Sequence, residues 1–276
     1  MALPSNFQFS QASLQDFTDC KRRFYYRYIE HLSWPALESE PAIENERFML
    51  QGAAFHQLVH QYILGIPEDR LVAIGEAEDF SDWWTSFIKH IPLDKNDRLF
   101  PESRLITAID QNRLQAKFDL VVAQKDGIFT IFDWKTSRKR PKRERMLSRL
   151  QSRVYPYVLA QSGKSINQGQ DIDPGQITMI YWYPNFPDNP EVMQYNKVQF
   201  QEDELYFTNL IKKIVSLDGI KSFDLTFNEL NCRYCVYRSL CDRGKSAGDL
   251  EEDVELLETE DFDLDIDFDQ IAEIEY

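Results

Sequence analysis

The sequence predicts an α/β protein whose mixed central sheet contains an antiparallel meander flanked by helices. Three observations support this fold class: apolar residues with helical spacing before residue 100, three strand-like segments in succession after it, and further helical segments beyond them. The 276 residues are 43% hydrophobic and 13% aromatic, so the chain can bury a sizeable core without disulfides.

The segments before the first strand are predicted to be helical. One helix is expected over 11–32, where aromatic and basic side chains interleave. A second is expected over about 44–64, and it carries His56 and His60. One or two more helices should occupy 66–100.

Three short segments rich in β-branched and aromatic residues follow, at 104–110, 113–122 and 128–134. A Lys-Asp-Gly turn at 125–127 separates the last two, which is typical of a hairpin. These segments therefore predict a three-stranded antiparallel meander.

The elements after the meander alternate between helix and strand. A helix is expected over 147–160 with a kink at Pro156, followed by strands at 177–183 and 192–200 and a helix at 203–217. We predict one domain over residues 1–248. Its helical part covers about 11–100, its core about 101–200, and a helix with a cysteine segment about 201–248.

The net charge of −15 is concentrated in a tail at 249–276, which has fourteen acidic residues and no Lys or Arg. The rest of the chain is nearly neutral, with 32 acidic residues against 31 basic ones, so the overall charge does not exclude a nucleic-acid partner. The tail is predicted to be disordered. A sharper hypothesis is that it mimics a nucleic-acid backbone, covering a basic groove or docking on a protein partner.

Two carboxylates and one ammonium group are predicted to meet where two adjacent strands end. Asp119 closes the segment Gln115-Ala116-Lys117-Phe118-Asp119, and fourteen residues later Asp133-Trp134-Lys135 ends the next strand. Phosphodiester hydrolysis uses a divalent cation held by hard oxygen ligands, and paired carboxylates supply such ligands. A D-x-K triplet alone is common by chance, so this pattern needs support from elsewhere in the chain.

These residues resemble the motif of the PD-(D/E)XK nucleases, whose core is restriction-endonuclease-like. The segment from Gly52 to His56 is similar to the G-x-x-x-H helix of the RecB-like branch, and Gln151 with Tyr155 is similar to its Q-x-x-x-Y motif. The resemblance implies that Mg²⁺ or Mn²⁺ is held by a shared set of ligands and that other residues act on water and substrate. The implied ligands are His56, Asp119, Asp133 and the Trp134 carbonyl, with Lys135 positioning water and Gln151 and Tyr155 supporting substrate.

Two other interpretations of these residues remain open, a zinc site and a non-catalytic fold. His60 lies one turn after His56, so the pair could hold zinc as in metalloprotease helices, although Gln57 stands where the H-E-x-x-H motif needs Glu. Glu102 precedes the meander and is left outside the predicted set. The fold could also serve as a non-catalytic nucleic-acid-binding subunit.

A basic run follows the D-x-K strand and favours contact with a phosphate backbone. Between residues 135 and 153 there is one acid, Glu144, and there are nine bases. They are Lys135, Arg138, Lys139, Arg140, Lys142, Arg143, Arg145, Arg149 and Arg153. A solvated helix start without a ligand is the alternative.

The four cysteines form a second pattern, in which Cys232, Cys235 and Cys241 are clustered and Cys20 lies 212 positions upstream. Three clustered thiolates with a distant fourth suit a 4Fe-4S cluster, with a structural Zn²⁺ site as the alternative. The order resembles that of RecB/AddB-like and CRISPR-associated exonucleases. Either group would clamp the two chain ends together.

The resemblance spans Ser13 to Cys241 and has two departures, Ala116 for a usual glycine and Lys21 for a common proline. It implies an exonuclease acting on single-stranded DNA ends in repair or recombination, with CRISPR spacer acquisition as an alternative setting. No apolar stretch approaches the length of a membrane span, and Met1 to Ser10 lacks the features of a secretory leader, so we expect a cytoplasmic protein without a membrane partner.

Overall fold

The computed structural model describes most of the body of the chain. The described ranges are 3–4, 6–32, 42–77, 80–91, 93–137, 139–232 and 235–244. The acidic tail at 249–276, and with it the hypothesis that it mimics nucleic acid, lies outside these residues.

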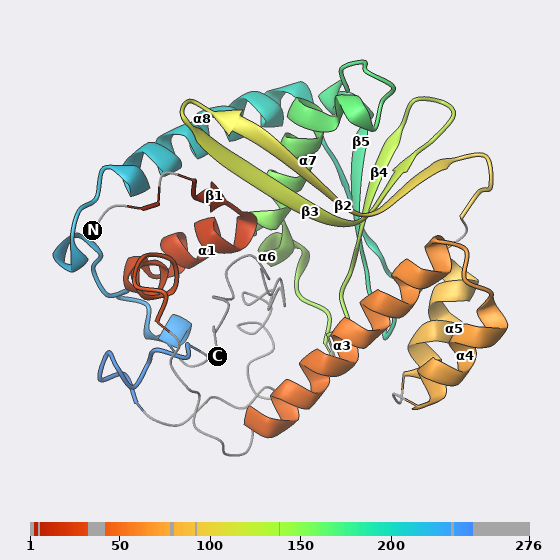
Figure 1. Ribbon diagram of the computed structural model, residues 1–276, viewed down its shortest axis with the longest axis horizontal. Helices are drawn as coiled ribbons and strands as arrows, with labels where there is room; N and C mark the ends of the chain where they lie inside the picture. The colour runs from red at the N-terminus through yellow and green to blue at the C-terminus, as the bar shows by residue number, and fades with distance from the viewer. Residues whose placement is uncertain are drawn as a thin grey trace, which may run out of the picture.

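A single mixed sheet forms the centre of the fold (Figure 1). The predicted antiparallel meander is confirmed, because β2 pairs antiparallel with β3 and β3 pairs antiparallel with β4. β4 then pairs parallel with β5, and β6 pairs antiparallel with β5. A short strand that the sequence analysis did not predict, β1, pairs parallel with the start of β3. The strands are β1 Gln8–Phe9, β2 Arg98–Ile109, β3 Asn112–Ala123, β4 Phe129–Trp134, β5 Ile177–Trp182 and β6 Glu191–Gln194.

The N-terminal helical part differs from the prediction at its first element. The expected helix over 11–32 is divided into α1 (Gln11–Asp19), α2 (Lys21–Phe24) and a π-helical turn (Tyr25–Ile29). The break falls at Cys20, whose extended backbone (φ −159°, ψ 108°) ends α1 and begins α2. Helical periodicity persists across such a break, so the apolar pattern alone could not reveal it.

The next three helices agree with the expected order. They are α3 (Ala42–Ile63), α4 (Glu68–Ala77) and α5 (Ser81–His90). In Figure 1 these three helices lie together on one side of the sheet, beneath the ends of β4 and β5.

Two boundaries after the meander were predicted wrongly. The strand expected over 192–200 ends at Gln194, because the Asn196 side chain accepts hydrogen bonds from two backbone N–H groups and starts a helix there. The helix expected over 147–160 is two helices, separated by the extended backbone of Arg149, and it continues through Pro156. The helices are α6 Arg143–Ser148, α7 Gln151–Ser162 and α8 Lys197–Val215, with 3₁₀ turns at Gly163–Ser165, Pro174–Gln176, Ile220–Ser222 and Glu229–Cys232.

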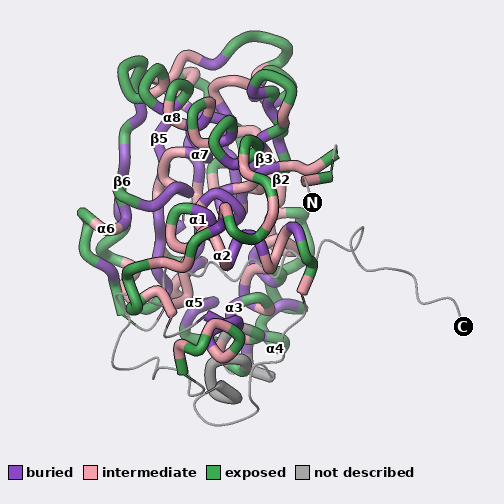
Figure 2. The backbone as a smooth tube through the Cα atoms, turned by 90° about the vertical axis from the view of Figure 1, so that its left-hand side faces the viewer, coloured by how far each residue is buried: buried purple, intermediate pink, exposed green. Residues whose placement is uncertain are grey.

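Each face of the sheet buries its own hydrophobic core. One core joins the sheet to α1, α7 and α8, with Phe118, Tyr157 and Phe207 among its fully buried members. The other joins it to α3, α4 and α5 and includes Phe55 and Trp182. Figure 2 shows buried residues along the strands and the inner sides of these helices.

The part of the chain that the structure describes contains no helix long and apolar enough to span a bilayer.

Candidate functional site

The predicted carboxylates lie side by side where β3 and β4 diverge. Leu120 is paired with Phe132, so the next step of the same register sets Asp119 opposite Asp133. The backbone N–H of Trp134 donates to Oδ2 of Asp119 at 2.7 Å, which ties the two strands together beyond the ladder. Adjacent antiparallel strands therefore bring the two acids of the motif together, as predicted.

A change of face within β3 brings a third carboxylate to this point. Side chains two apart on a strand normally share a face, but Phe118 packs in one core and Leu120 in the other. On β2, the residue opposite Asp119 is Glu102, which has a left-handed φ of 47° and no partner in the ladder. A non-glycine residue rarely adopts this conformation. The change of face in β3 and the left-handed residue in β2 therefore occur at the same level of the sheet, where Glu102 lies opposite Asp119.

His56, Glu102 and Asp119 form a group that could hold a metal ion. One ligand atom from each residue lies within 4.8 Å of the other two. The Nδ1 atom of His56, on α3, lies 3.4 Å from Oδ1 of Asp119. An imidazole with two carboxylates offers mainly hard oxygen ligands, which suit Mg²⁺ or Mn²⁺. Glu102 stands outside the ligand set predicted from the sequence, and its place beside Asp119 accompanies its left-handed backbone conformation.

The charges in this group determine its protonation. Burial alone would lower the pKa of His56, but the adjacent Asp119 carboxylate outweighs burial and raises it to about 9. Burial likewise favours a higher pKa for Asp119, but His56 and the Trp134 N–H lower it. The metal-free site therefore holds an imidazolium–carboxylate pair at neutral pH, and a cation that binds the imidazole must displace its proton.

Asp133 lies beside this group and is held by two predicted residues. Its Oδ1 accepts a hydrogen bond from Nε2 of Gln151 at 2.8 Å, and its Oδ2 lies 3.0 Å from Nζ of Lys135. Asp133 and Gln151 are each 3% exposed. The ammonium group of Lys135 is therefore next to a motif carboxylate, and α7 supplies the amide that orients that carboxylate.

Three other residues of the prediction, Tyr155, His60 and Trp134, have different relationships to the carboxylate site. Tyr155 is buried with its ring 5.1 Å from that of Phe118, one residue before Asp119. His60 is not part of the metal-capable group found among the described residues, whose only histidine is His56. Trp134 contacts Asp119 through its backbone N–H.

Several of the bases between residues 135 and 153 form ion pairs within the fold. Arg140 and Arg143 form ion pairs with Glu191, a residue of β6 that is only 4% exposed. Arg153 pairs with the buried Asp203 on α8, at 2.5 Å. Together with Lys135, which pairs with Asp133, four of the nine bases thus neutralise buried carboxylates, and Arg138 lies outside the described residues.

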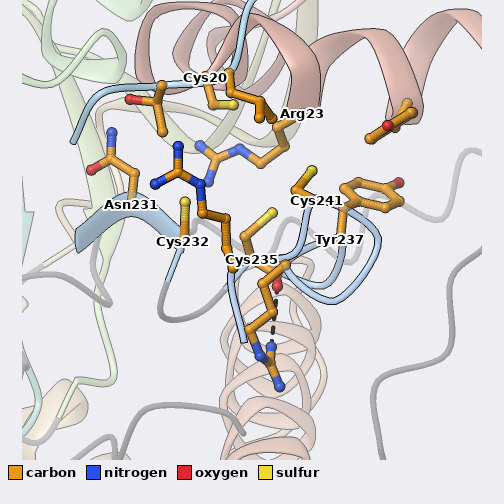
Figure 3. A pocket seen from close by; sticks show the side chains of 12 residues that line it. Cys20, Arg23, Asn231, Cys232, Cys235, Tyr237 and Cys241 are labelled. Atoms are coloured by element: carbon orange, nitrogen blue, oxygen red, sulfur yellow. Dashed lines mark hydrogen bonds between the residues drawn. The ribbon is translucent and has the colours of Figure 1, made fainter. Parts of the chain in front are cut away.

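The cysteines of both chain ends line one pocket (Figure 3). Cys20 comes from the break between α1 and α2, and Cys232, Cys235 and Cys241 come from the C-terminal segment. Arg23 also lines the pocket, together with Arg238 and Arg243. Four thiols beside three cationic groups suit the negative charge of a thiolate-ligated metal or cluster. All four cysteines therefore lie around the same pocket.

The thiols influence one another, as they must to share one metal group. Burial raises the pKa of Cys232 and Cys241, and the nearby Cys20 raises both further. The chain ends also touch directly: Asn231 donates to the Asp19 carbonyl at 3.0 Å and Tyr237 to the Leu32 carbonyl at 3.0 Å. The pocket therefore lies within a preformed junction between the two ends.

The two departures from the family pattern fit their surroundings. Ala116 is 2% exposed in the core and pairs with Leu105 across the sheet, so its methyl group is buried against apolar neighbours. Lys21 begins α2 and forms an ion pair with Asp224 at 3.4 Å. Neither substitution touches the carboxylate site or removes a thiol.

Comparison with known proteins identifies a family. The family model described as the PD-(D/E)XK nuclease superfamily matches residues 8–242, and the mixed sheet with flanking helices is the restriction-endonuclease-like core expected from the sequence. The crystal structure of SSO0001 is similar with a TM-score of 0.41 and 11% identity, covering 85% of each chain. A candidate exonuclease from Eubacterium rectale is similar with a TM-score of 0.46 and 12% identity, covering 75% of this chain and 79% of its own. A comparison with curated proteins finds no match.

Proposed function

Because this chain belongs to the PD-(D/E)XK nuclease superfamily, we propose that it is a Mg²⁺- or Mn²⁺-dependent deoxyribonuclease. The observation that carries the proposal is the convergence of His56, Glu102 and Asp119 beside the Asp133–Lys135 pair. A nuclease that cleaves by hydrolysis needs a cation site and a positioned ammonium group in contact with one reacting phosphate. The proposal is supported by the presence of every group named in the motif and by the register that sets Asp119 opposite Asp133.

Each side chain has a role that follows from its position. When bound, a divalent cation would polarise the phosphodiester and lower the pKa of the attacking water. His56, Asp119, Asp133 and the Trp134 carbonyl are the proposed ligands, and we add Glu102 to them. Lys135 orients the water and offsets the charge that develops on the phosphate.

The two helix residues act around this centre. Gln151 holds the Asp133 carboxylate by its 2.8 Å hydrogen bond. Tyr155 lies one turn further along the same face of α7 and packs beneath β3. We propose that this face of α7 fixes the carboxylates and supports the scissile strand.

The substrate we propose is the end of single-stranded DNA, in a repair or recombination setting. Support comes from the motif resemblance and from the exposed bases beside the site, including Lys139 and Lys142. CRISPR spacer acquisition is the alternative setting, and no contact in the structure favours it.

We also propose that the cysteine pocket holds a 4Fe-4S cluster with a structural role. The arrangement of thiols from both chain ends, with Arg23, Arg238 and Arg243 around them, supports a bound anionic group. A cluster would offer four irons, each able to take one of the four thiolates, and would fasten the N-terminal helices to the C-terminal segment. Zinc would satisfy the same thiols, so metal analysis has to separate the two.

The test is a cleavage assay with anaerobically purified protein and end-labelled single- and double-stranded DNA, with and without Mn²⁺. We expect Mn²⁺-dependent cleavage of single strands from an end. Lys135→Ala should reduce kcat by about 100-fold or more, since it removes a cation aimed at the developing charge. The visible absorption spectrum and the iron content of the same sample report on the cluster.

His60→Ala is the matched control, since His60 lies on the same helix one turn beyond His56. Its activity should stay within about twofold of the wild type. A zinc-dependent activity abolished by His60→Ala would contradict the proposal and favour a two-histidine zinc hydrolase. Tight DNA binding without cleavage in Mn²⁺ would favour a non-catalytic binding subunit.

A further inference from the structure

Tyr181 contacts the site from β5 and belongs to none of the motifs in the sequence. It is paired with Asp133 across the parallel β4–β5 ladder, so the two side chains lie on the same face of the sheet. Tyr181 is 1% exposed. Its hydroxyl lies 3.3 Å from Oε1 of Gln151, whose Nε2 donates to Asp133.

We propose that Tyr181 is a positioning residue whose hydroxyl holds the Gln151 amide so that its nitrogen, and not its oxygen, faces Asp133. This inference rests on the proposed function, because it concerns how a carboxylate of the metal site is oriented. The two ends of an amide have opposite hydrogen-bonding character. A flipped amide would direct its oxygen at the Asp133 carboxylate and repel it.

The hydroxyl protons around Tyr181 support this direction. Tyr181 and Ser152 each have one hydroxyl proton, and three acceptors surround them: the Met146 carbonyl, the Gln151 oxygen and whichever hydroxyl accepts from the other. A carbonyl oxygen can only accept, so the Ser152 hydroxyl donates to the Met146 carbonyl at 2.6 Å, beside the N–H of Arg149 at 3.2 Å. The Tyr181 hydroxyl is then the donor toward both the Ser152 oxygen at 2.9 Å and the Gln151 oxygen at 3.3 Å.

The contacts therefore link Ser152 to Tyr181, and the donor direction from Tyr181 runs through the Gln151 amide to Asp133. Burial raises the pKa of Tyr181, so its hydroxyl keeps its proton as a donor over the working pH range. Every member after Ser152 is at least 97% buried, so water cannot easily replace a missing partner. The ring of Tyr181 also lies 5.7 Å below the ammonium of Lys135, the other partner of Asp133.

The test compares Tyr181→Phe with Tyr183→Phe. Tyr183 is just as buried and follows two residues later, but its hydroxyl donates to the Met146 sulfur instead. Each variant removes one hydroxyl from a buried tyrosine. The dissociation constant for Mn²⁺ alone, measured by calorimetry on the full-length protein, should rise about threefold to tenfold for Tyr181→Phe and stay within about twofold for Tyr183→Phe.

A second experiment tests whether Tyr181 acts by orienting the Gln151 amide or only by packing in the core. In a Gln151→Ala background there is no amide to orient, so adding Tyr181→Phe should leave the Mn²⁺ dissociation constant unchanged. Equal weakening by the two tyrosine variants, no weakening by Tyr181→Phe, or additive effects with Gln151→Ala would each overturn the inference. Failure of the proposed function looks different: wild-type protein that binds no Mn²⁺, or binds it and cleaves no DNA.

Discussion

Gly52 and Thr136 approach each other so closely that there is no room for a side chain at the glycine. A Cβ atom added to Gly52 would lie 2.7 Å from Oγ1 of Thr136. Gly52 is one turn before His56 on α3, and Thr136 directly follows Lys135. The contact therefore joins the histidine helix to the segment that directly follows the D-x-K triplet.

Replacing Gly52 by Ala should weaken Mn²⁺ binding by about threefold or more, because α3 must move or Thr136 must rotate to relieve the clash. Thr136→Ala in the same chain removes the clashing oxygen and should restore binding. Calorimetry on the two single variants and the double variant measures the coupling. Additive effects of the two substitutions would show that the close approach does not position His56.

The protonation of His56 gives a prediction on pH. In metal-free protein, NMR titration of the imidazole should give a pKa of about 9. Asp119→Asn should lower that pKa, because it removes the charge that opposes burial most strongly. A wild-type value near 6.5 would contradict the ion pair that the structure places here.

The same shift determines how stability depends on pH. The pKa of His56 in the folded state lies above its ordinary value of 6.5, so the ion pair stabilises metal-free protein fully below pH 6.5. That stability should be lost as the pH rises through about 9. Mn²⁺ affinity should change in the opposite sense, increasing over this window as the competing proton leaves. Denaturation midpoints and Mn²⁺ titrations at pH 6, 7.5 and 9 measure both trends.

Glu191 should contribute to stability through its two arginines. Glu191→Gln removes a buried charge that faces Arg140 and Arg143, whose side chains are 35% and 52% exposed. We expect a loss of about 1–3 kcal/mol in the free energy of unfolding, less than for a fully buried pair because solvent screens the arginines. Urea denaturation measures it, with Glu144→Gln at an exposed position as the control. Equal effects of the two variants would contradict a structural role for the pair.

Cys20 should connect the two chain ends through the metal group. Cys20→Ser should abolish the visible absorption of the cluster and lower the melting temperature by roughly 4–8 °C, which corresponds to about 2 kcal/mol in a chain of this size. Iron and zinc analysis of the wild type identifies the metal. Zinc without iron would contradict the cluster, and an unchanged melting temperature would contradict the clamp.

The acidic tail can be tested although it lies outside the described residues. If it competes with nucleic acid, removing the residues after Gly248 should raise the affinity for single-stranded DNA, and more at low salt than at high salt. Fluorescence anisotropy at two salt concentrations measures this. An affinity unchanged by the truncation at both concentrations would rule out the competition.

Much of this molecule could be predicted from local sequence. The meander follows from three β-branched segments and a hairpin turn, because strand period and turn chemistry are properties of neighbouring residues. Asp119, Asp133 and Lys135 meet because adjacent antiparallel strands must return to the same sheet edge. The pairing of Cys20 with the C-terminal cysteines followed from the thiol count and a family resemblance.

Only the tertiary structure decided which groups complete the site. Glu102 reaches Asp119 through a left-handed backbone position on another strand, and Tyr181 reaches Gln151 across the sheet. The arginines at 140 and 143 have a carboxylate partner about fifty residues away, at Glu191. Such contacts join residues far apart in the chain, and helical or strand periodicity contains no information about distance between elements. Packing of the two cores against the sheet sets those distances.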